Sequence, residues 1–199
     1  SAEGRPLRAT IAHIDITESR QRAESAPPEE QARAVAERIA DLQAAGAQVA
    51  VLTAISGHSI LSELEAVSPL PIASVLPALG AYADRAGLRR IGIIGSAAAM
   101  DTGAMGAFGA RQTVSPTDPG LRAELIGIYF EMAVARRCTD AQRELFFEAG
   151  RALVREQGAE AVLLGGTDLC LAFDGRDPGY REIDAIDVHV AALVPKALA

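Results

Sequence analysis

The residues best suited to chemistry follow a short apolar stretch late in the chain. Residues 161–164 (Ala-Val-Leu-Leu) are all apolar, and residues 165–168 (Gly-Gly-Thr-Asp) come directly after them. A strand that is apolar on both faces is typical of a parallel sheet covered by helices. Glycines at its end let the backbone turn sharply and approach a ligand, and open α/β sheets bind ligands at the carboxyl ends of strands. We therefore expect the site here, with Thr167 binding substrate and Asp168 as a general base or a helix N-cap.

An earlier stretch repeats this pattern. Residues 46–56 align with residues 158–168 without a gap, so that Ala54 corresponds to Gly166 and Ser56 to Asp168. Internal similarity indicates duplicated units, although any strand after a helix in an α/β protein shares part of the pattern. Ser56, Gly57 and His58 follow the earlier strand, where the His58 ring is suited either to acid–base chemistry or to capping the next helix.

Two further positions are candidates for binding or proton transfer. Ser96 and Ala97 begin a helix after the apolar stretch 89–95, and backbone N–H groups at such a point suit a carboxylate or phosphate. His189 lies near the start of the last helical stretch, where it can face the same site. The three histidines lie on separate elements without metal-ligand spacing. Walker, dinucleotide and Gly-x-Ser-x-Gly motifs are missing, so we expect neither a metal nor a cofactor.

Composition narrows the class of protein. Of 199 residues, 49% are hydrophobic but only 4% aromatic, so the core must rest on Ala, Val, Ile and Leu. The net charge of −7 and a pI near 5.0 argue against nucleic acid or anionic membrane as partners. Lys196 is the only lysine, so a Schiff base is not expected. The two cysteines, Cys138 and Cys170, form no disulfide framework, and the lack of a signal peptide or membrane-length apolar run predicts a cytoplasmic protein.

Strands and helices alternate along the chain, as in a parallel α/β sheet. Hydrophobic patterning predicts strands at 7–14, 49–52, 70–75, 89–96, 112–114, 161–164 and 183–186. It predicts helices at 27–45, 60–67, 77–86, 98–109, 118–137, 139–157 and 188–198, and a loop at 17–26. The predicted fold has two similar halves, each a parallel sheet flanked by helices, with a ligand cleft between them. Residues 1–86 and 187–199 form the first half and residues 87–186 the second.

Four motifs in order resemble the aspartate/glutamate racemase superfamily. Residues 54–58 (Ala-Ile-Ser-Gly-His) are similar to its Cys-Asn-Thr-Ala-His motif, and residues 164–169 (Leu-Gly-Gly-Thr-Asp-Leu) to its Leu-Gly-Cys-Thr-Glu-Leu motif. Residues 91–103 resemble its second-domain strand, turn and helix, and residues 184–189 its closing Asp-x-x-x-x-His. The resemblance implies a cofactor-independent enzyme that acts on a small carboxylate or amino acid, commonly as a homodimer.

The same resemblance marks two departures. Family racemases use two thiols on opposite faces of the α-carbon, and the corresponding positions here are Ala54 and Gly166, neither of which can carry a proton. The family also begins with a glycine-rich strand–turn unit, and no such unit precedes Leu7. The resemblance then leaves either a lineage without that unit or a unit supplied by another chain.

Three readings follow. The first is an isomerase-class enzyme with a non-thiol site, in which Asp168, His58 and His189 transfer protons while Ser56, Gly57, Ser96, Ala97 and Thr167 bind substrate. The second is a catalytically degenerate homologue that binds a ligand or a partner, or a lyase or decarboxylase of the same superfamily. The third, a thiol racemase working through Cys170 or Cys138, ranks last, because Cys170 lies about one helical turn beyond Gly166.

Overall fold

The structure, a computed structural model, describes residues 9–197 and the side chains of residues 9–195. Within that part, the chain forms two compact units. Unit 1 contains residues 9–52, 60–74 and 191–197, and unit 2 contains residues 53–59 and 75–190. The predicted division placed residues 53–59, 75–86 and 187–190 in the first half, whereas the contacts of the structure group them with unit 2. All the candidate site residues therefore belong to unit 2.

Unit 1 is built on a two-stranded parallel sheet. Strands β1 (Ala50–Val51) and β2 (Ile72–Ala73) pair with one another. Helices α1 (Ile16–Ser25), α2 (Pro28–Ala44) and α3 (Leu61–Val67) complete the unit, together with the end of α9 (Ala185–Ala197). Its apolar core joins one face of α2 to α3 and both strands, with these buried residues: Ala32, Ala36, Ile39, Ala50, Ile60, Leu64 and Leu70.

Unit 2 is built on a four-stranded parallel sheet in the order β4-β3-β5-β6. The strands are β3 (Arg90–Gly95), β4 (Gln112–Val114), β5 (Ala161–Gly165) and β6 (Glu182–Asp184). The central pair is in register, with Ile91 opposite Ala161 and Gly95 opposite Gly165. Both central strands are buried along almost their whole length, as their continuous apolar sequences predict.

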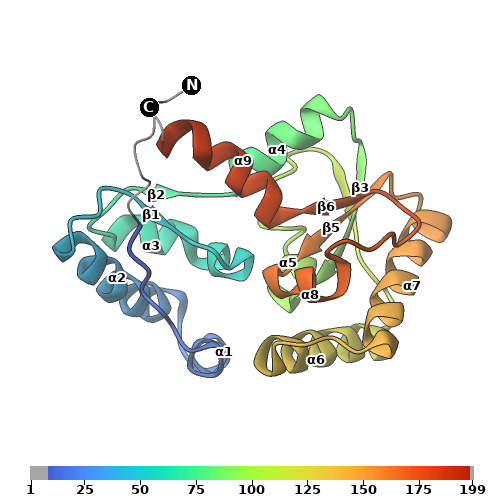
Figure 1. Cartoon of the computed structure of the whole chain (residues 1–199), viewed down its shortest axis with the longest axis horizontal. Helices are drawn as coiled ribbons and strands as arrows, with labels where there is room; N and C mark the ends of the chain where they lie inside the picture. The colour runs from blue at the N-terminus through green and yellow to red at the C-terminus, as the bar shows by residue number, and fades with distance from the viewer. Residues whose placement is uncertain (1–8, 198–199) are drawn as a thin grey trace. The chain divides into compact units, whose positions relative to one another are not determined.

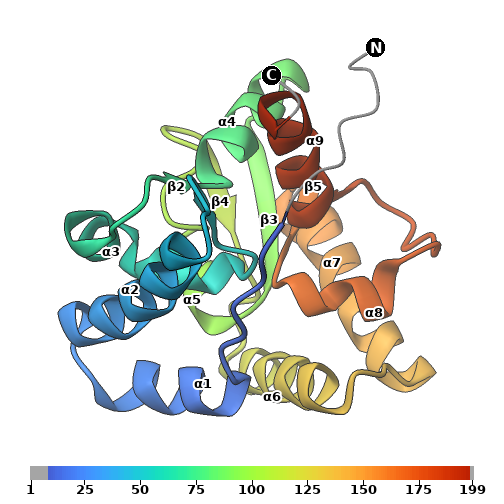
Figure 2. The same cartoon turned by 60° about the vertical axis from the view of Figure 1, so that its left-hand side comes forward.

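Helices cover both faces of this sheet (Figures 1 and 2). Successive strand residues point to opposite faces, so Ile93 and Leu163 pack with α4 (Leu76–Arg85) and α5 (Ala97–Asp101). Ile94 and Leu164 pack on the other face with α6 (Pro119–Ala135), α7 (Asp140–Gln157) and α8 (Cys170–Phe173). The central strands therefore lie in a rigid sheet that helices cover on both faces, and this sheet holds their carboxyl ends in place.

The repeat seen in the sequence extends to local structure. In both copies an α-helix leads into a parallel strand, and a 3-10 helix follows: η1 (Ile55–Ile60) after β1 and η2 (Thr167–Leu169) after β5. An α-helix, α3 or α8, comes next. The two copies differ in strand length, since β1 has two residues and β5 has five.

The first elements differ from the prediction. Residues 9–15 form no strand, and Ile11 is 91% exposed, so the alternating pattern there does not pair with a sheet; Leu7 and Arg8 lie outside the described residues. The predicted loop after them is helix α1. Asp15 explains this helix, because its carboxylate accepts hydrogen bonds from the N–H groups of Thr17 and Glu18 at 2.9 and 3.1 Å.

Helix α5 is shorter than predicted. It ends at Asp101, whereas the prediction extended a helix to residue 109. Residues 103–106 all have positive φ, which an α-helix does not allow, and Ala104 and Met105 are non-glycine residues at φ 53°. Composition favoured a helix here because the stretch is rich in alanine and methionine, and the left-handed run overrides that preference. The segment still reaches the core, because Ala104 and Phe108 are buried.

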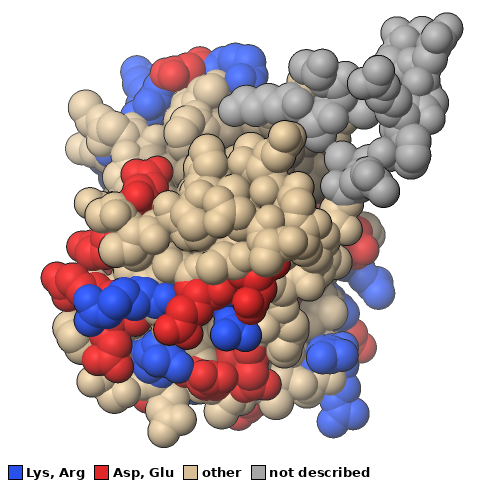
Figure 3. Space-filling view, turned by 90° about the vertical axis from the view of Figure 1, so that its left-hand side faces the viewer, with Lys and Arg blue, Asp and Glu red and all other residues tan. Residues whose placement is uncertain are grey.

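Charge on the surface is mixed in sign. Three exposed ion pairs lie on α1 and α2, namely Arg20–Glu24, Arg22–Glu18 and Arg38–Asp41. On the face seen in Figure 3, basic and acidic side chains are interspersed and form no continuous basic surface. Pairs of this kind contribute little stability individually. Because this face has no continuous row of positive charge, it does not offer a binding surface for a polyanion.

Candidate active site

The carboxyl ends of β3 and β5 are tied together by Ser96. Its backbone N–H and its hydroxyl both donate to the carbonyl oxygen of Gly165, at 3.1 and 2.9 Å, and the same hydroxyl accepts from the N–H of Ala99 at 3.3 Å. Gly95 permits this approach, because its φ is +131° and a Cβ there would lie 2.7 Å from the Gly165 carbonyl carbon. Ser96 was predicted to bind substrate; in the structure its N–H and hydroxyl bond to the neighbouring strand end.

The glycines after β5 are explained by protein packing. A Cβ on Gly165 would lie 2.7 Å from the Cβ of Ala99 and 2.9 Å from the carbonyl oxygen of Ile94. A Cβ on Gly166 would lie 2.5 Å from both Cε2 and Cζ of Tyr129. We expected these glycines to let a ligand approach the backbone. The structure instead fills the space with Ala99 and with the phenol of Tyr129.

Asp168 is paired with that same phenol. The hydroxyl of Tyr129, on α6, donates to Oδ2 of Asp168 at 3.2 Å. Burial raises the pKa of Tyr129, and the negative charge of Asp168 raises it further. The phenol therefore keeps its proton at neutral pH. Sequence reasoning missed Tyr129, because the residue lies on the apolar face of a helix and nothing in its spacing marks it as polar chemistry.

The thiol nearest the site is held in its protonated form. Burial raises the pKa of Cys170, and the charges of Asp168 and Asp184 add to the effect. Asp184 ends β6, and its Oδ1 accepts from the N–H of Ile186 at 2.7 Å. Burial likewise raises the pKa of Cys138, which lies just before α7. Since the thiolate is the reactive form of cysteine, these surroundings work against thiol chemistry.

His58 is buried, and its ring is bound to the backbone. Nδ1 lies 3.3 Å from the carbonyl oxygen of Ala54 and 3.2 Å from that of Ile55, while Nε2 accepts from the N–H of Val75 at 3.4 Å. Accepting at Nε2 requires the proton on Nδ1. Burial lowers the pKa of His58, and nearby His189 adds a smaller effect in the same direction. The neutral ring thus clamps η1 to the start of α4.

The remaining predicted residues divide between the two junctions. Ala54 precedes η1, which contains the half-buried Ser56 and Gly57. Thr167 begins η2 and Ala97 begins α5, and both are half-buried. His189 is a buried residue of α9 whose charge influences His58. Ser56, Gly57 and His58 therefore follow β1, Ala97 follows β3, and Thr167 and Asp168 follow β5.

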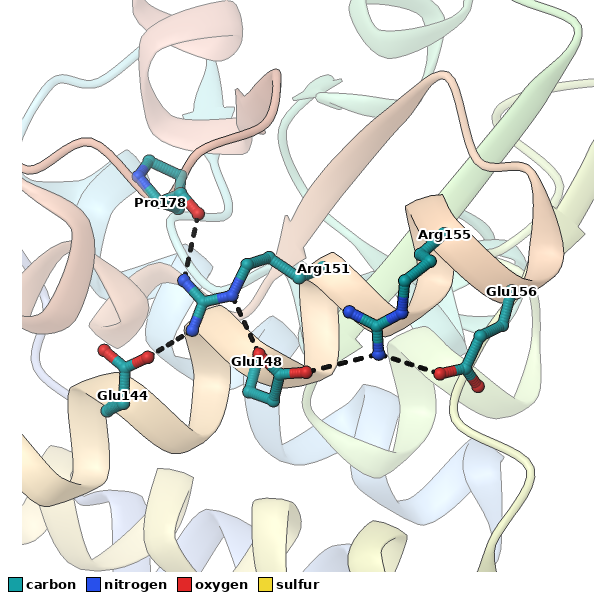
Figure 4. Close-up of polar contacts among 6 residues, drawn as sticks. All are labelled: Glu144, Glu148, Arg151, Arg155, Glu156 and Pro178. Atoms are coloured by element: carbon teal, nitrogen blue, oxygen red, sulfur yellow. Dashed lines mark hydrogen bonds and ion pairs between the residues drawn. The ribbon is translucent and has the colours of Figure 1, made fainter.

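Helix α7 fixes the segment that follows η2. Arg143 donates from Nε to the carbonyl oxygen of Ala172 at 3.0 Å, and Arg151 donates from Nη1 to that of Pro178 at 3.3 Å. Arg151 is itself held by Glu144 and Glu148 on the same helix (Figure 4). These bonds join the β5–β6 connection to α7.

A surface hollow of about 670 Å³ lies at the opposite ends of the strands. It is lined by Leu88, Arg89, Arg90, Ala110, Arg111, Gln112, Gly158 and Glu160. Its arginines already have partners: Arg90 donates to the carbonyl oxygen of Gln157 at 2.7 Å and Arg111 to that of Leu88 at 2.9 Å. These arginines are therefore engaged in bonds within the protein, and we assign the hollow no catalytic role. Among the described residues, no group of His, Cys, Asp and Glu side chains is arranged to hold a metal ion, and none of the helices has the length and apolarity to cross a membrane.

The fold and the residues that follow β5 define a parallel α/β protein with polar residues at the carboxyl ends of its central strands. The sequence matches the model of the Asp/Glu/Hydantoin racemase family over residues 3–193. The chain therefore belongs to that family, as the four motifs predicted. No curated protein sequence matches it significantly.

Solved structures agree on the fold. An Asp/Glu racemase-like protein from Yersinia pestis superposes with a TM-score of 0.76 at 21% identity, over 94% of this chain and 82% of its own. An aspartate racemase homologue from Pyrococcus horikoshii gives 0.75 at 21% identity, over 96% and 83%. A liganded double mutant of arylmalonate decarboxylase gives 0.54 at 18% identity, over 85% and 75%. At these identities the likeness concerns the fold alone.

Proposed function

We propose that this protein is a cofactor-independent enzyme of the isomerase class that acts at the α-carbon of a small amino or carboxylic acid without a catalytic thiol. Membership of the racemase family supports the reaction class. The observation that carries the non-thiol site is the junction after β5, where the carboxylate of Asp168 pairs with the half-buried phenol of Tyr129 and the ring of Tyr129 lies beside Gly166. The proposal includes a cytoplasmic homodimer without nucleic-acid or membrane partners.

Asp168 takes the main role in proton transfer. Asp168 lies in η2, just after β5, and is half-buried, which suits a general base that must meet substrate in a partly dry site. His189 is the second candidate. We assign His58 a structural role, because both of its ring nitrogens already bond to the backbone.

Substrate binding is proposed for the small polar residues at the two junctions. Ser56 in η1 and Thr167 in η2 supply hydroxyl donors for a carboxylate, and Ala97 at the start of α5 supplies an N–H. The N–H of Gly57, the other candidate in η1, already donates to the carbonyl oxygen of Ala54 at 3.1 Å. The hydroxyl and N–H of Ser96 bond to Gly165, so Ser96 contributes by joining the strand ends.

A decarboxylase is the second candidate. Racemisation needs proton-carrying groups on both faces of the α-carbon, whereas decarboxylation needs one proton donor after CO₂ leaves. The phenol of Tyr129 keeps its proton at neutral pH and is such a donor. The fold likeness to arylmalonate decarboxylase is compatible with this alternative.

Exchange of the α-proton for deuterium tests the proposal. Purified protein is incubated in D₂O with a panel of amino acids and dicarboxylic acids, and a parallel panel of substituted malonates is followed for CO₂ release. We expect exchange with at least one acid, its loss in Asp168→Asn, and its retention in Cys170→Ser. CO₂ release without exchange would favour the decarboxylase. A protein that catalyses neither reaction but is stabilised by one of these acids would be a degenerate binding homologue, and the enzymatic proposal would fail.

A further inference from the structure

The phenol of Tyr129, on α6, occupies the space that a side chain at position 166 would need. The backbone of Gly166 is extended, with φ −168°, a conformation that any residue adopts. What excludes a side chain is the ring of Tyr129, whose hydroxyl oxygen lies 2.7 Å from the position of a Gly166 Cβ. The hydroxyl thus occupies the region that a short polar side chain on Gly166 would fill.

The core of unit 2 holds this phenol in place. Leu125 and Met132, four residues before and three residues after Tyr129, share its face of α6 and are fully buried. Tyr129 itself packs against the same core. Few rotations remain for a ring anchored in this way, so the direction of its hydroxyl is set by packing. The oxygen that it meets is Oδ2 of Asp168.

We propose that Tyr129 is a positioning residue for Asp168: its hydroxyl, brought into the space beside Gly166, fixes the carboxylate in one orientation while that carboxylate takes up the α-proton of the substrate. This inference rests on the proposed function. In the step, the substrate Cα–H bond breaks and the proton moves to the Asp168 carboxylate. The electron pair stays on the substrate and delocalises into its carboxyl group. Return of the proton from Asp168 to the same face restores the starting acid, whereas inversion needs a proton from a group on the opposite face, for which His189 is the candidate. Tyr129 keeps its own proton throughout.

A purely structural phenol predicts a different outcome on mutation. A hydrogen bond to a carboxylate contributes about 1.5–3 kcal/mol, which corresponds to roughly tenfold to a hundredfold in rate if it is needed to orient the base. Tyr129→Phe keeps the ring against Gly166 and removes only the hydroxyl. Tyr180→Phe is the matched control, because Tyr180 is another phenol of unit 2 whose buried hydroxyl meets no partner among the described residues.

Two measurements test the proposal. In the α-proton exchange assay, we expect Tyr129→Phe to lower kcat at least tenfold with KM within about twofold, and Tyr180→Phe to leave both unchanged. In ¹³C NMR spectra of tyrosine-labelled protein at neutral pH, the Cζ resonance of Tyr129 reports the hydrogen bond from its hydroxyl to Oδ2 of Asp168. That resonance should shift in Asp168→Asn and be nearly unmoved in Cys170→Ser.

The outcomes separate this inference from the proposed function. Wild-type exchange with an equally active Tyr129→Phe variant would overturn the role of Tyr129 and leave the proposed function standing. A Tyr129 Cζ resonance that is unmoved in Asp168→Asn would overturn the pairing itself, whatever the activity. Wild-type protein with no exchange would refute the proposed function and the catalytic role of the pair together.

Discussion

Adding one methyl group at Gly166 should destabilise unit 2 because it collides with Tyr129. The new Cβ would lie 2.5 Å from two ring carbons, whereas carbon atoms in contact prefer about 3.5–4.0 Å. The ring must therefore move by about 1 Å, and overpacking of this kind costs about 1–3 kcal/mol. We expect Gly166→Ala to lower the free energy of unfolding by that amount.

The same collision should disappear when the ring is removed. Tyr129→Leu alone should cost about 2–3 kcal/mol through lost packing and the lost hydrogen bond to Asp168. In the double variant the methyl group meets no ring, so the two effects should fall short of additivity by about 1–3 kcal/mol. The chain has no tryptophan, so urea unfolding is followed by far-UV circular dichroism.

Gly127→Ala is the matched control for this cycle. Gly127 lies on the same helix, and a Cβ there would have no atom within 4 Å. Alanine in an exposed helix position is better than glycine by about 0.5–1 kcal/mol, so this variant should be slightly stabilised. If Gly166→Ala were as harmless as Gly127→Ala, or if its effect simply added to that of Tyr129→Leu, the ring would not be what excludes a side chain.

Two further predictions concern buried polar groups of unit 2. Tyr180→Phe should raise the free energy of unfolding by about 1 kcal/mol, because the buried hydroxyl next to Gly150 meets no partner among the described residues; a loss of stability in thermal unfolding would reveal a bonded hydroxyl. His58 has a folded-state pKa below its ordinary 6.5, so its contribution to stability is complete above pH 6.5 and is lost as the pH falls through the lower, folded-state pKa. We expect His58→Gln to be destabilised at pH 7.5 and to lose part of the acid sensitivity of the wild type; equal pH dependence of the two proteins between pH 7.5 and 5 would contradict the clamp to Val75.

The sheet of unit 2 is readable from the sequence because its signals are local. The strands at 90–95 and 161–165 are continuous apolar runs, and the capping box of Thr139 and Gln142 marks the start of α7. The start of the chain misled the same reasoning. Residues 9–14 alternate like a strand, but a strand forms only where an edge is available to pair, which a local pattern does not report.

The residues that follow β5 show why a motif can be found and still be misread. Two consecutive glycines before a polar pair read as a loop open to a ligand. In the structure, Ala99 leaves no room for a side chain at Gly165, and Tyr129 leaves none at Gly166. Tyr129 lies 37 positions before Gly166 in the sequence, on helix α6. Position 166 and Tyr129 therefore pack together although they are far apart in the sequence, so a short sequence pattern does not reveal the contact. Glycine is required at position 166 because the ring of Tyr129 fills the space of a side chain.

The contact between Gly166 and Tyr129 decides which side chains position 166 can hold. A thiol at position 166 and a phenol at position 129 compete for the same space, so the two arrangements exclude one another. Replacing Gly166 by cysteine would therefore not rebuild a thiol site unless the ring were shortened at the same time. A side chain at position 166 therefore requires the ring of Tyr129 to move, and the proposed activity is explained with the phenol and Asp168 in place.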